Sequence, residues 1–531
     1  MSWLRLALNR FNPVNTTMPD EENREILNTL AKGAGITAFG MFFSKAITYF
    51  YRALVGRALG PEAYGQLSIG MMIVGIAATL SGDPVRNGLK KFIPEFREDN
   101  DNASIKGIVI SALEINLIGS LLVGGTIFFS AEFIAVQIFE STELIPIIQV
   151  FGLVPIIGRP YDIFIDTTIA FNKAKYKVIS TNIVQNLVQL AATAAFIYIG
   201  MDVMGAVWGW VAGVAFTLPL AYYFMEKKVG PVLTQKVKAQ HHRKKLFKFS
   251  YPLMLSGIIS VFLGWTDTAF LGYYMNETAV GLYNAAFPTA LLLLIPHQAI
   301  GQLALTSFSE TGAKGKSREE TLKISARWVF ALTFPTFLIM ALFSSELLTL
   351  LFGKQYSTAG TALAILALGN LVNTAVGRVA DIMKSSGHTK PVFYNNIVNL
   401  GANIILNVVL IPVLGVLGAA IATASSIAFV NILLAAEVYR YEKIHAFTKE
   451  ELKIVLASSL ALGATYLIIN QAFAMTPYWT LIPAGIIFYS LYITIFGKIG
   501  GLTEYDREII LTLGRKASQE KRVKKILSLI T

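Results

Sequence analysis

A small set of ionisable side chains lies inside long apolar stretches of the sequence. Each such charge costs roughly 2.5 to 3.5 kcal/mol at the centre of a bilayer, so these residues usually face a wet cavity or a bundle interior. They can bind an anion, bind a proton or a metal cation, or pair with one another. The set consists of Lys45, Arg52, Glu114, Arg159, Asp162, Asp166, Asp267, His297, Arg378 and Asp381.

Lys45 and Arg52 are the basic residues that best suit an anionic ligand. They lie seven positions apart, which places them on one helix face about two turns from each other. The apolar stretch that contains them has no acidic residue that could neutralise them. We therefore predict a basic stripe that binds a phosphate group, with Arg159 as a further cation, because a guanidinium group forms paired, charge-assisted hydrogen bonds.

Acidic residues and one histidine are candidates for binding a coupling ion, which would be a proton or a sodium ion. Asp267 is the lone acid in its apolar stretch, and the other candidates are Asp162, Asp166 and His297. His297 can equally be a hydrogen-bonded core residue. No metal site and no cofactor other than a coupling ion are predicted.

A structural role for the arginine and aspartate pairs remains open. Arg159 precedes Asp162 by three positions, and Arg378 precedes Asp381 by three. On a helix, residues at this spacing are neighbours, so each pair can serve packing or topology instead of ligand binding.

The overall composition places these residues in a membrane protein. Of 531 residues, 54% are hydrophobic and only 15% are charged, and the mean hydropathy is +0.56. These values indicate a polytopic membrane protein. The net charge of +12 comes from short basic segments between apolar runs, where basic residues orient helices, so no nucleic-acid partner is predicted. The absence of cysteine excludes disulfides and thiolate metal sites.

A spanning helix needs about 20 mainly apolar residues, and this length predicts about 14 spans. Alternate loops are rich in Lys and Arg, as the positive-inside rule requires of cytoplasmic loops. The pattern predicts a multi-pass protein of the cell membrane with both termini cytoplasmic. The predicted spans are 33–56, 65–82, 105–129, 144–169, 177–200, 203–225, 249–273, 281–305, 324–351, 359–384, 392–413, 416–439, 452–474 and 478–497.

An internal repeat divides the spans into two lobes. The sequence Gly-Arg-x-x-Asp occurs at 158–162 and again at 377–381, and Asn-Ile-Val follows at 182–184 and 396–398. Both repeats have six spans, so an axis along the membrane normal should relate them. The predicted segments are an amphipathic cytoplasmic segment at 1–32, lobes at 33–226 and 249–440, a basic cytoplasmic linker at 227–248, two extra spans within 451–497 and a basic cytoplasmic tail at 498–531.

Two segments carry a resemblance to a known family. Residues 57–65 read RALGPEAYG, and residues 88–96, after the second span, read GLKKFIPEF. Together they resemble the signature of the polysaccharide-biosynthesis, or oligosaccharide flippase, proteins of the multidrug and oligosaccharidyl-lipid exporter superfamily. The resemblance implies two lobes around a central cavity that opens alternately to each side. It also suggests that the two extra helices flank a groove for a lipid tail.

The sequence as a whole predicts a transporter and not an enzyme. Its expected substrate is a lipid-linked, phosphate-bearing oligosaccharide, moved to the outer leaflet, and its expected partners are that substrate and membrane lipids. A cation-coupled multidrug exporter of the same superfamily is the first alternative, favoured by Asp267 and by Asp162 with Asp166. A membrane-embedded glycan polymerase or ligase is the second, but it would need catalytic acids and a sizeable outward loop, and the predicted loops are short.

Overall fold

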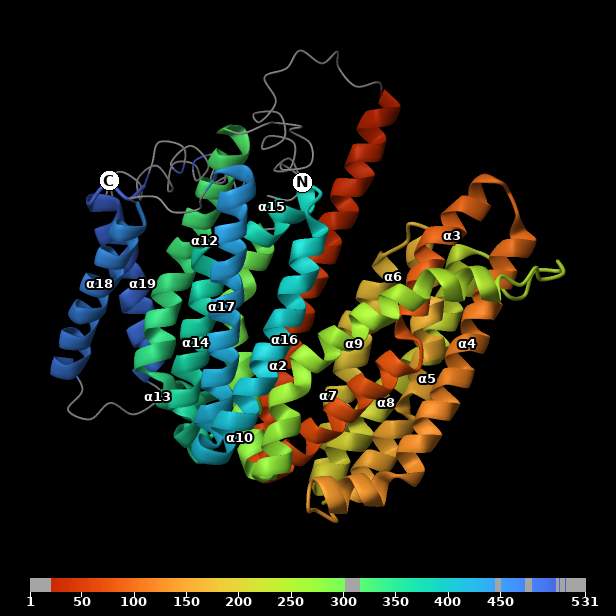
Figure 1. Ribbon diagram of the computed structural model, residues 1–531, viewed down its shortest axis with the longest axis horizontal. Coiled ribbons are helices and arrows are strands. Elements are labelled where there is room, and N and C mark those ends of the chain that lie inside the picture. Colours follow the sequence, from red (N-terminus) through yellow and green to blue (C-terminus); the bar gives the residue numbers. More distant parts are fainter. Residues whose placement is uncertain are drawn as a thin grey trace. The chain divides into compact units, whose positions relative to one another are not determined.

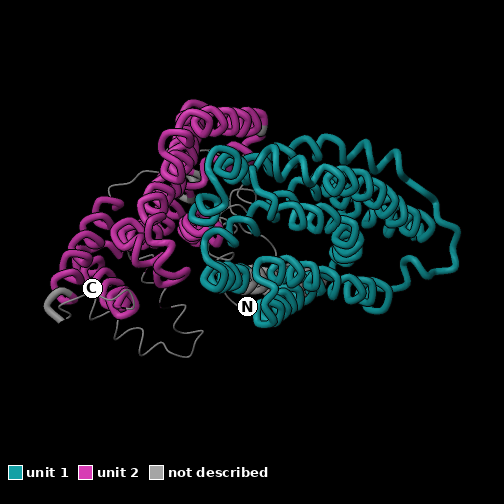
Figure 2. The backbone as a smooth tube through the Cα atoms, turned by 90° about the horizontal axis from the view of Figure 1, so that it is seen from below, with its two compact units in different colours: residues 1, 3–284 teal, residues 2, 285–531 magenta. Residues whose placement is uncertain are grey.

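The structure is a computed structural model that describes residues 21–300, 316–444, 450–472, 480–502, 506 and 511. The described elements are helices (Figure 1), and 12 of them are long and apolar enough to cross a membrane. The prediction of an all-helical membrane protein is confirmed. The chain forms two compact units, unit 1 ending at Asn284 and unit 2 beginning at Ala285 (Figure 2).

Unit 1 contains long helices joined by short turns and π-helical segments. Its helices are α2 (Glu21–Leu80), α3 (Arg86–Glu98), α4 (Asn102–Phe129), α5 (Leu144–Ala170), α6 (Lys175–Lys177), α7 (Asn186–Tyr198), α8 (Asp202–Tyr223), α9 (Arg243–Tyr274) and the first part of α10 (Glu277–Ala290).

The helix α2 is two helices separated at a glycine. Gly60 has φ 82° and ψ 174°, a backbone conformation that a side chain would strain, and Pro61 then begins the second helix, as proline does at a first helical position. The break falls inside the segment 57–65 that carries the family resemblance. The predicted first and second spans therefore lie on either side of Gly60.

The short helix α3 is amphipathic and covers the end of unit 1. Its apolar side chains, Leu89, Phe92 and Ile93 among them, are buried in one core with residues of α4, α5 and α9. Its polar side carries Arg86 and Lys90 toward α5. Apolar packing therefore fixes the helix, and the polar face is free to make specific contacts.

Unit 2 contains the remaining helices. They are α12 (Lys316–Leu342), α13 (Ser344–Phe352), α14 (Gly360–Ala375), α15 (Val379–Ser385), α16 (Thr389–Leu414), α17 (Val416–Glu442), α18 (Glu450–Ala472) and α19 (Leu481–Lys498). Side chains of α18 and α19 share one core with Phe330 of α12 and Leu371 of α14. The two extra helices thus pack on α12 and α14.

The count of 14 spans remains a prediction. One of the 12 candidates, Lys45–Leu80, covers two predicted spans. The predicted span 177–200 is helical as far as Tyr198. Its first part is a π-helical segment, Val178–Gln185, and its second part is α7, so it is not counted as one long helix. The difference lies at a kink and at a π-helical segment, not at a missing apolar stretch.

Two repeated glycines meet inside unit 1. A Cβ atom added to Gly65 would lie 1.8 Å from the carbonyl oxygen of Glu277, and one added to Gly281 would lie 1.8 Å from that of Pro61. The two contacts are reciprocal, because Pro61 and Gly65 stand at the same separation as Glu277 and Gly281. Small residues allow such close helix packing, and the reciprocity is what a two-fold repeat produces.

Unit 1 extends beyond the predicted first lobe, because residues 249–284 belong to it. The predicted lobes follow the sequence repeat, whereas the compact units follow packing. The lobe and linker boundaries at 226, 248 and 440 therefore remain predictions.

Candidate functional site

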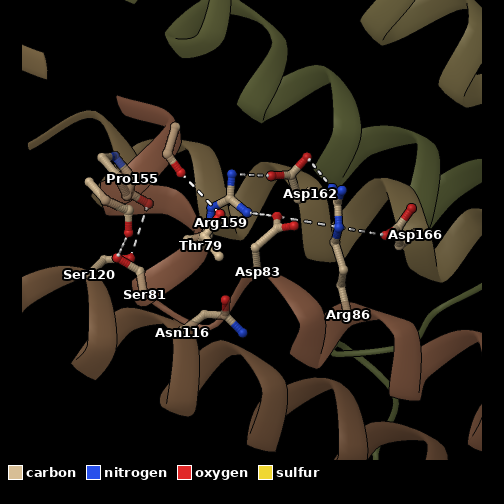
Figure 3. Close-up of polar contacts among 12 residues, drawn as sticks. Thr79, Ser81, Asp83, Arg86, Asn116, Ser120, Pro155, Arg159, Asp162 and Asp166 are labelled. Atoms are coloured by element: carbon tan, nitrogen blue, oxygen red, sulfur yellow. Dashed lines mark hydrogen bonds and ion pairs between the residues drawn. The ribbon is translucent and has the colours of Figure 1, made fainter. Parts of the chain in front are cut away.

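Six charged residues of unit 1 form a ladder of ion pairs. Three of them lie on α3 and on the turn that precedes it, and the other three lie on α5. Asp83 pairs with Arg159, Arg86 Nη1 lies 3.0 Å from Asp162 Oδ1, and Lys90 Nζ lies 3.2 Å from an Asp166 oxygen. Figure 3 shows Arg159 between Asp83 and Asp162, and Arg86 between Asp162 and Asp166. We call this set the charge ladder; its members are Asp83, Arg86, Lys90, Arg159, Asp162 and Asp166.

The ladder forms because the two segments carry opposite charges at equal spacing. One reads acid, base, base at positions 83, 86 and 90, and the other reads base, acid, acid at 159, 162 and 166. Both use steps of three and four residues, which keep side chains on one helix face. Three cations thus meet three anions, and the ladder is neutral overall.

Cross-contacts tie the rungs to one another. Arg159 Nη2 lies 2.8 Å from Asp162, and Arg86 Nε lies 3.4 Å from Asp83 and 3.5 Å from Asp166. Burial would lower the pKa of Arg86, but Asp162, Asp83 and Asp166 together raise it above its ordinary value. Arg86 therefore remains charged at every physiological pH.

A glycine turn sets the position of Asp83. Gly82 has φ 99°, which favours glycine, and Pro84 follows in the short 3-10 turn Asp83–Val85. This turn carries the chain from the end of α2 into α3. Asp83 then faces Arg159 while Arg86 and Lys90 follow on the same side.

Burial is uneven along the ladder. The Asp166 side chain is 1% exposed, whereas those of Arg86 and Lys90 are 29% and 35% exposed. Within the described residues Arg159 Nε has no hydrogen-bond partner, and the contacts of Asp166 Oδ2 are its ion pairs with Arg86 and Lys90. The side chains from α5 therefore form the more buried side of the ladder, and those from α3 and its preceding turn form the more accessible side.

A second set of polar contacts in unit 1 includes Arg52 and Asp267, whose partners end at the adjacent residues Asn284 and Tyr283. Arg52 hydrogen-bonds to the Tyr64 hydroxyl, which itself donates to the carbonyl oxygen of Asn284 at 3.3 Å. Tyr283 donates to Asp267 Oδ2 at 2.5 Å, and Asp267 is buried. We call these five residues, which lie on α2, α9 and α10, the Arg52–Asp267 cluster.

Lys45 lies on α2, seven residues before Arg52, and is exposed. Arg52 is half-buried. The two residues share a helix, as predicted, whereas Arg159 belongs to the charge ladder and already faces Asp83 and Asp162. Two carboxylates thus already pair with Arg159, which makes it the weakest candidate among the three predicted phosphate ligands.

Glu114 of α4, also among the charges in apolar stretches, accepts two hydrogen bonds from Arg243, at 2.6 and 2.9 Å. This paired contact joins α4 to the first turn of α9.

In unit 2 the second Gly-Arg-x-x-Asp sequence makes a simpler arrangement. Arg378 pairs with Asp381 and donates to the carbonyl oxygen of His297 at 3.1 Å. The His297 ring atom Nδ1 is buried and has no hydrogen-bond partner within the described residues. Arg378, Asp381 and His297 are thus brought together, although no sequence motif groups His297 with the other two.

Two rows of amide and hydroxyl side chains are further candidates that the sequence motifs did not reveal. Gln185 Oε1 and Asn399 Oδ1 are buried without a partner in the described residues, and each stands three positions after the matching Asn182 and Asn396. Steps of four residues on one helix face were the signal that could have revealed these rows. The rows are Gln185, Gln189 and Thr193 in unit 1, and Asn395, Asn399, Asn403 and Asn407 in unit 2.

Asp83, Arg86 and Lys90 were also missed as partners of Arg159, Asp162 and Asp166. The basic residues among them looked like ordinary loop charges on the cytoplasmic side. The matching spacing of opposite charges at 83, 86 and 90 and at 159, 162 and 166 was the signal.

A family model described as "Polysaccharide biosynthesis protein" matches residues 54–361, which include the charge ladder and every residue of the Arg52–Asp267 cluster except Arg52. The chain belongs to this family. One relative of this family member is the "Probable low-salt glycan biosynthesis flippase Agl15" of Haloferax volcanii. It is 23% identical over 419 residues, which cover 76% of this chain and 79% of the relative.

Solved transporters share the fold of this family member. A structure of the "Lipid II flippase MurJ, inward closed conformation" aligns with a TM-score of 0.71 at 16% identity, covering 87% of this chain and 98% of that one. An inward-facing MATE-family multidrug resistance transporter of the MOP superfamily aligns with a TM-score of 0.61 at 15% identity, covering 75% and 94%. At these identities the likeness concerns the fold alone.

Proposed function

We propose that this protein is a flippase for a lipid-linked, phosphate-bearing oligosaccharide. It moves the glycan headgroup from the cytoplasmic to the outer leaflet by alternating access, for the synthesis of a cell-surface polysaccharide or glycoconjugate. The observation that carries the proposal is the match to a glycan biosynthesis flippase over 76% of the chain. The family assignment and the shared fold of the lipid II flippase support it.

The physical task is to carry a polar glycan and a phosphate through hydrocarbon. A phosphate that leaves water needs charge-assisted hydrogen bonds to offset its desolvation. We assign this role first to Arg52, whose guanidinium is held by Tyr64, and to Lys45 on the same helix. Arg159 contributes less, because two carboxylates already share its charge.

Purified protein in vesicles tests the proposal directly. Transfer of a labelled lipid-linked oligosaccharide between leaflets, dependent on the protein, is the expected result. Formation of a new glycosidic bond without leaflet transfer would instead identify a polymerase or ligase.

A cation-coupled multidrug exporter is the second candidate, because the MATE-family transporter has the same fold. The basic stripe of Lys45 and Arg52 does not suit cationic drugs, since like charges repel. Efflux of cationic dyes from the same vesicles, with no movement of lipid-linked oligosaccharide, would favour this candidate.

Coupling to an ion is proposed at Asp267. Its carboxylate is buried in a span and accepts a hydrogen bond from Tyr283, so the binding of a proton or sodium ion would disturb the Arg52–Asp267 cluster. Asp267→Asn should impair transport and leave membrane insertion intact. Unchanged transport at every imposed ion gradient would remove Asp267 from the mechanism. Asp162, Asp166 and His297 are weaker candidates, because the two aspartates face cations of the ladder and His297 lies beside Arg378.

The proposed orientation places both termini in the cytoplasm of a cell whose outer membrane surface receives the glycan. Because the chain has no cysteine, single cysteines can report on it. Asp202→Cys and Glu277→Cys should react with an impermeant thiol reagent applied outside intact cells, and Lys236→Cys should not. Labelling at position 236 would reverse the orientation.

A further inference from the structure

One face of α9 is left open by the packing of unit 1. Only 11% of the most apolar window of α9 is buried, compared with 61% in the candidate span Lys45–Leu80. On its packed side, Leu246 and Gly257 approach α3, its preceding turn and α2. A Cβ atom at Gly88 would lie 2.2 Å from Leu246, and one at Gly257 would lie 3.5 Å from Pro84 and from Thr79.

The opposite side of α9 carries a stripe of exposed residues. Its residues follow one another by four, three, four and seven positions, which keeps them on one helix face. Tyr251, Leu255 and Phe262 are 53%, 49% and 49% exposed, and the two lysines are also exposed. The stripe offers about 16 Å of apolar surface beyond its lysines, at 1.5 Å per residue. We call it the α9 stripe: Lys244, Lys248, Tyr251, Leu255 and Phe262.

The two lysines of the α9 stripe differ from their basic neighbours. Arg243 pairs with Glu114, and Lys245 Nζ lies 3.7 Å from Glu95. For Lys244 and Lys248 no ion pair occurs in the described part of the chain. Lys91 Nζ, 4.6 Å from the centre of the Phe249 ring, adds a cation at the same end of α9. An anion is therefore drawn to this end of the stripe.

We propose that the α9 stripe binds the lipid part of the transported molecule before the headgroup moves. The phosphate or pyrophosphate lies at Lys244 and Lys248, and the hydrocarbon chain lies along Tyr251, Leu255 and Phe262. This inference rests on the proposed function and adds a docking place outside the Arg52–Asp267 cluster.

Charge selects this occupant over ordinary membrane lipid. Any lipid chain can cover an apolar helix face, but two uncompensated lysines favour the headgroup with the greater negative charge, at about 1 kcal/mol per lysine near a membrane surface. A pyrophosphate carries more negative charge than the single phosphodiester of a bulk phospholipid. The order of groups along the stripe, cations first and then apolar side chains, matches that of a lipid pyrophosphate.

Photo-crosslinking of the full chain tests this assignment. A photoreactive phenylalanine derivative replaces Leu255, or Ile405 of α16 as a control that is also exposed. The protein is placed in nanodiscs that contain phosphatidylcholine and phosphatidylglycerol. The probe is radiolabelled lipid-linked oligosaccharide extracted from the host cells. Strong labelling at 255 and weak labelling at 405 are expected.

Charge variants then separate the lysines of the stripe from general surface charge. Lys244→Gln with Lys248→Gln should reduce labelling at 255 by about tenfold or more. Lys236→Gln with Lys238→Gln removes the same charge from exposed linker positions and should leave the labelling unchanged. Folding of each variant is checked by its elution as a monodisperse species.

Three results would overturn the inference: equal labelling at 255 and 405, labelling that ignores the loss of Lys244 and Lys248, or equal competition by phosphatidylglycerol. Leaflet transfer by the unmodified protein is measured separately. A protein that flips the probe but does not label at 255 refutes the α9 stripe alone. A protein that does not flip it refutes the proposed function.

Discussion

The two copies of Gly-Arg-x-x-Asp are held in different ways in the two units. In unit 1, Arg159 and Asp162 belong to a ladder that joins α5 to α3 and its preceding turn. In unit 2, Arg378 and Asp381 pair with each other, and Arg378 also donates to the carbonyl oxygen of His297. A repeated motif thus preserves a local ion pair, while its structural role depends on which charged residues the neighbouring segment contains.

The backbone differs at the same place. Gly158 lies within the continuous helix α5, whereas α14 ends at Ala375 and α15 begins at Val379. Gly377, between them, has φ 75°. The arginine of unit 2 therefore stands at a helix break, and discontinuous spans of this kind are common where transporters bind ligands or move.

The largest expected effect comes from reversing the charge of a buried rung. Asp166→Lys should strongly destabilise the protein, because it places a cation against Arg86 and Lys90 at a position that is 1% exposed. Breaking a buried pair costs about 3 to 5 kcal/mol. The thermal unfolding temperature and the amount of protein in the membrane measure the effect.

Two variants control this experiment. Adding Lys90→Asp to Asp166→Lys restores the rung in reverse and should recover part of the stability, the remainder being repulsion from Arg86. Asp381→Lys, which faces one arginine in unit 2, should cost less than Asp166→Lys. Equal losses at 166 and 381 would mean that the ladder adds nothing to the local pair.

How far the sequence predicts these features depends on whether they are local. The turn at Gly60 and the pairs at 159 and 162 and at 378 and 381 follow from short-range patterns, and the structure contains them. The link from Arg159 to Asp83 joins residues 76 positions apart, and only packing brings them together. The helix break at Gly377 was also missed, because Gly158 occupies the same place in the repeat and stays helical.

A second effect concerns transport and not stability. Lys45→Gln and Arg52→Gln should depress both flipping and the binding of lipid-linked oligosaccharide, because they remove cations that do not belong to the charge ladder and can bind the phosphate. Arg378→Gln should have a smaller effect, since that arginine is committed to Asp381. Binding and flipping by purified variants in vesicles measure the difference.

The contrary result has a clear meaning here too. If both Gln variants transported at the normal rate with normal affinity, the stripe of Lys45 and Arg52 would be only structural. Arg52→Lys sharpens the test: it should keep part of the activity if charge dominates, and lose most of it if the paired geometry of the guanidinium dominates.

A smaller effect follows from the different backbones of the two glycines. Gly377→Ala should cost about 1 to 2 kcal/mol, because an L side chain is strained at positive φ. Gly158→Ala should be neutral or slightly stabilising, because the nearest atom to a Cβ there is 3.9 Å away and alanine favours a helix. Unfolding temperatures of the two variants give the comparison, and equal values would mean that the break at Gly377 is not required.

The smallest effect tests whether α3 needs a third contact besides its apolar core and the charge ladder. His242 stacks on Phe96 of α3 at 4.8 Å between ring centres, and its Nε2 lies 2.8 Å from Ser104 Oγ. Burial, and then the charge of Lys245, lower the pKa of His242.

Acid should therefore loosen this contact. A histidine with a lowered pKa in the folded state contributes stability above its unfolded pKa of about 6.5, and that contribution is lost as the pH falls through the lower folded value. A spin label on a single cysteine at position 238 of the linker should become more mobile between neutral pH and about pH 5, where histidine titrates. His242→Gln should abolish the change, and His241→Gln, at an exposed neighbour, should not.

If transport and unfolding temperature stay constant while the label becomes mobile, the apolar core and the charge ladder are sufficient to hold α3. If both fall together with the release of the linker, α3 depends on His242 as well as on Arg86 and Lys90, and the contrast with unit 2 is then one of packing as much as of charge.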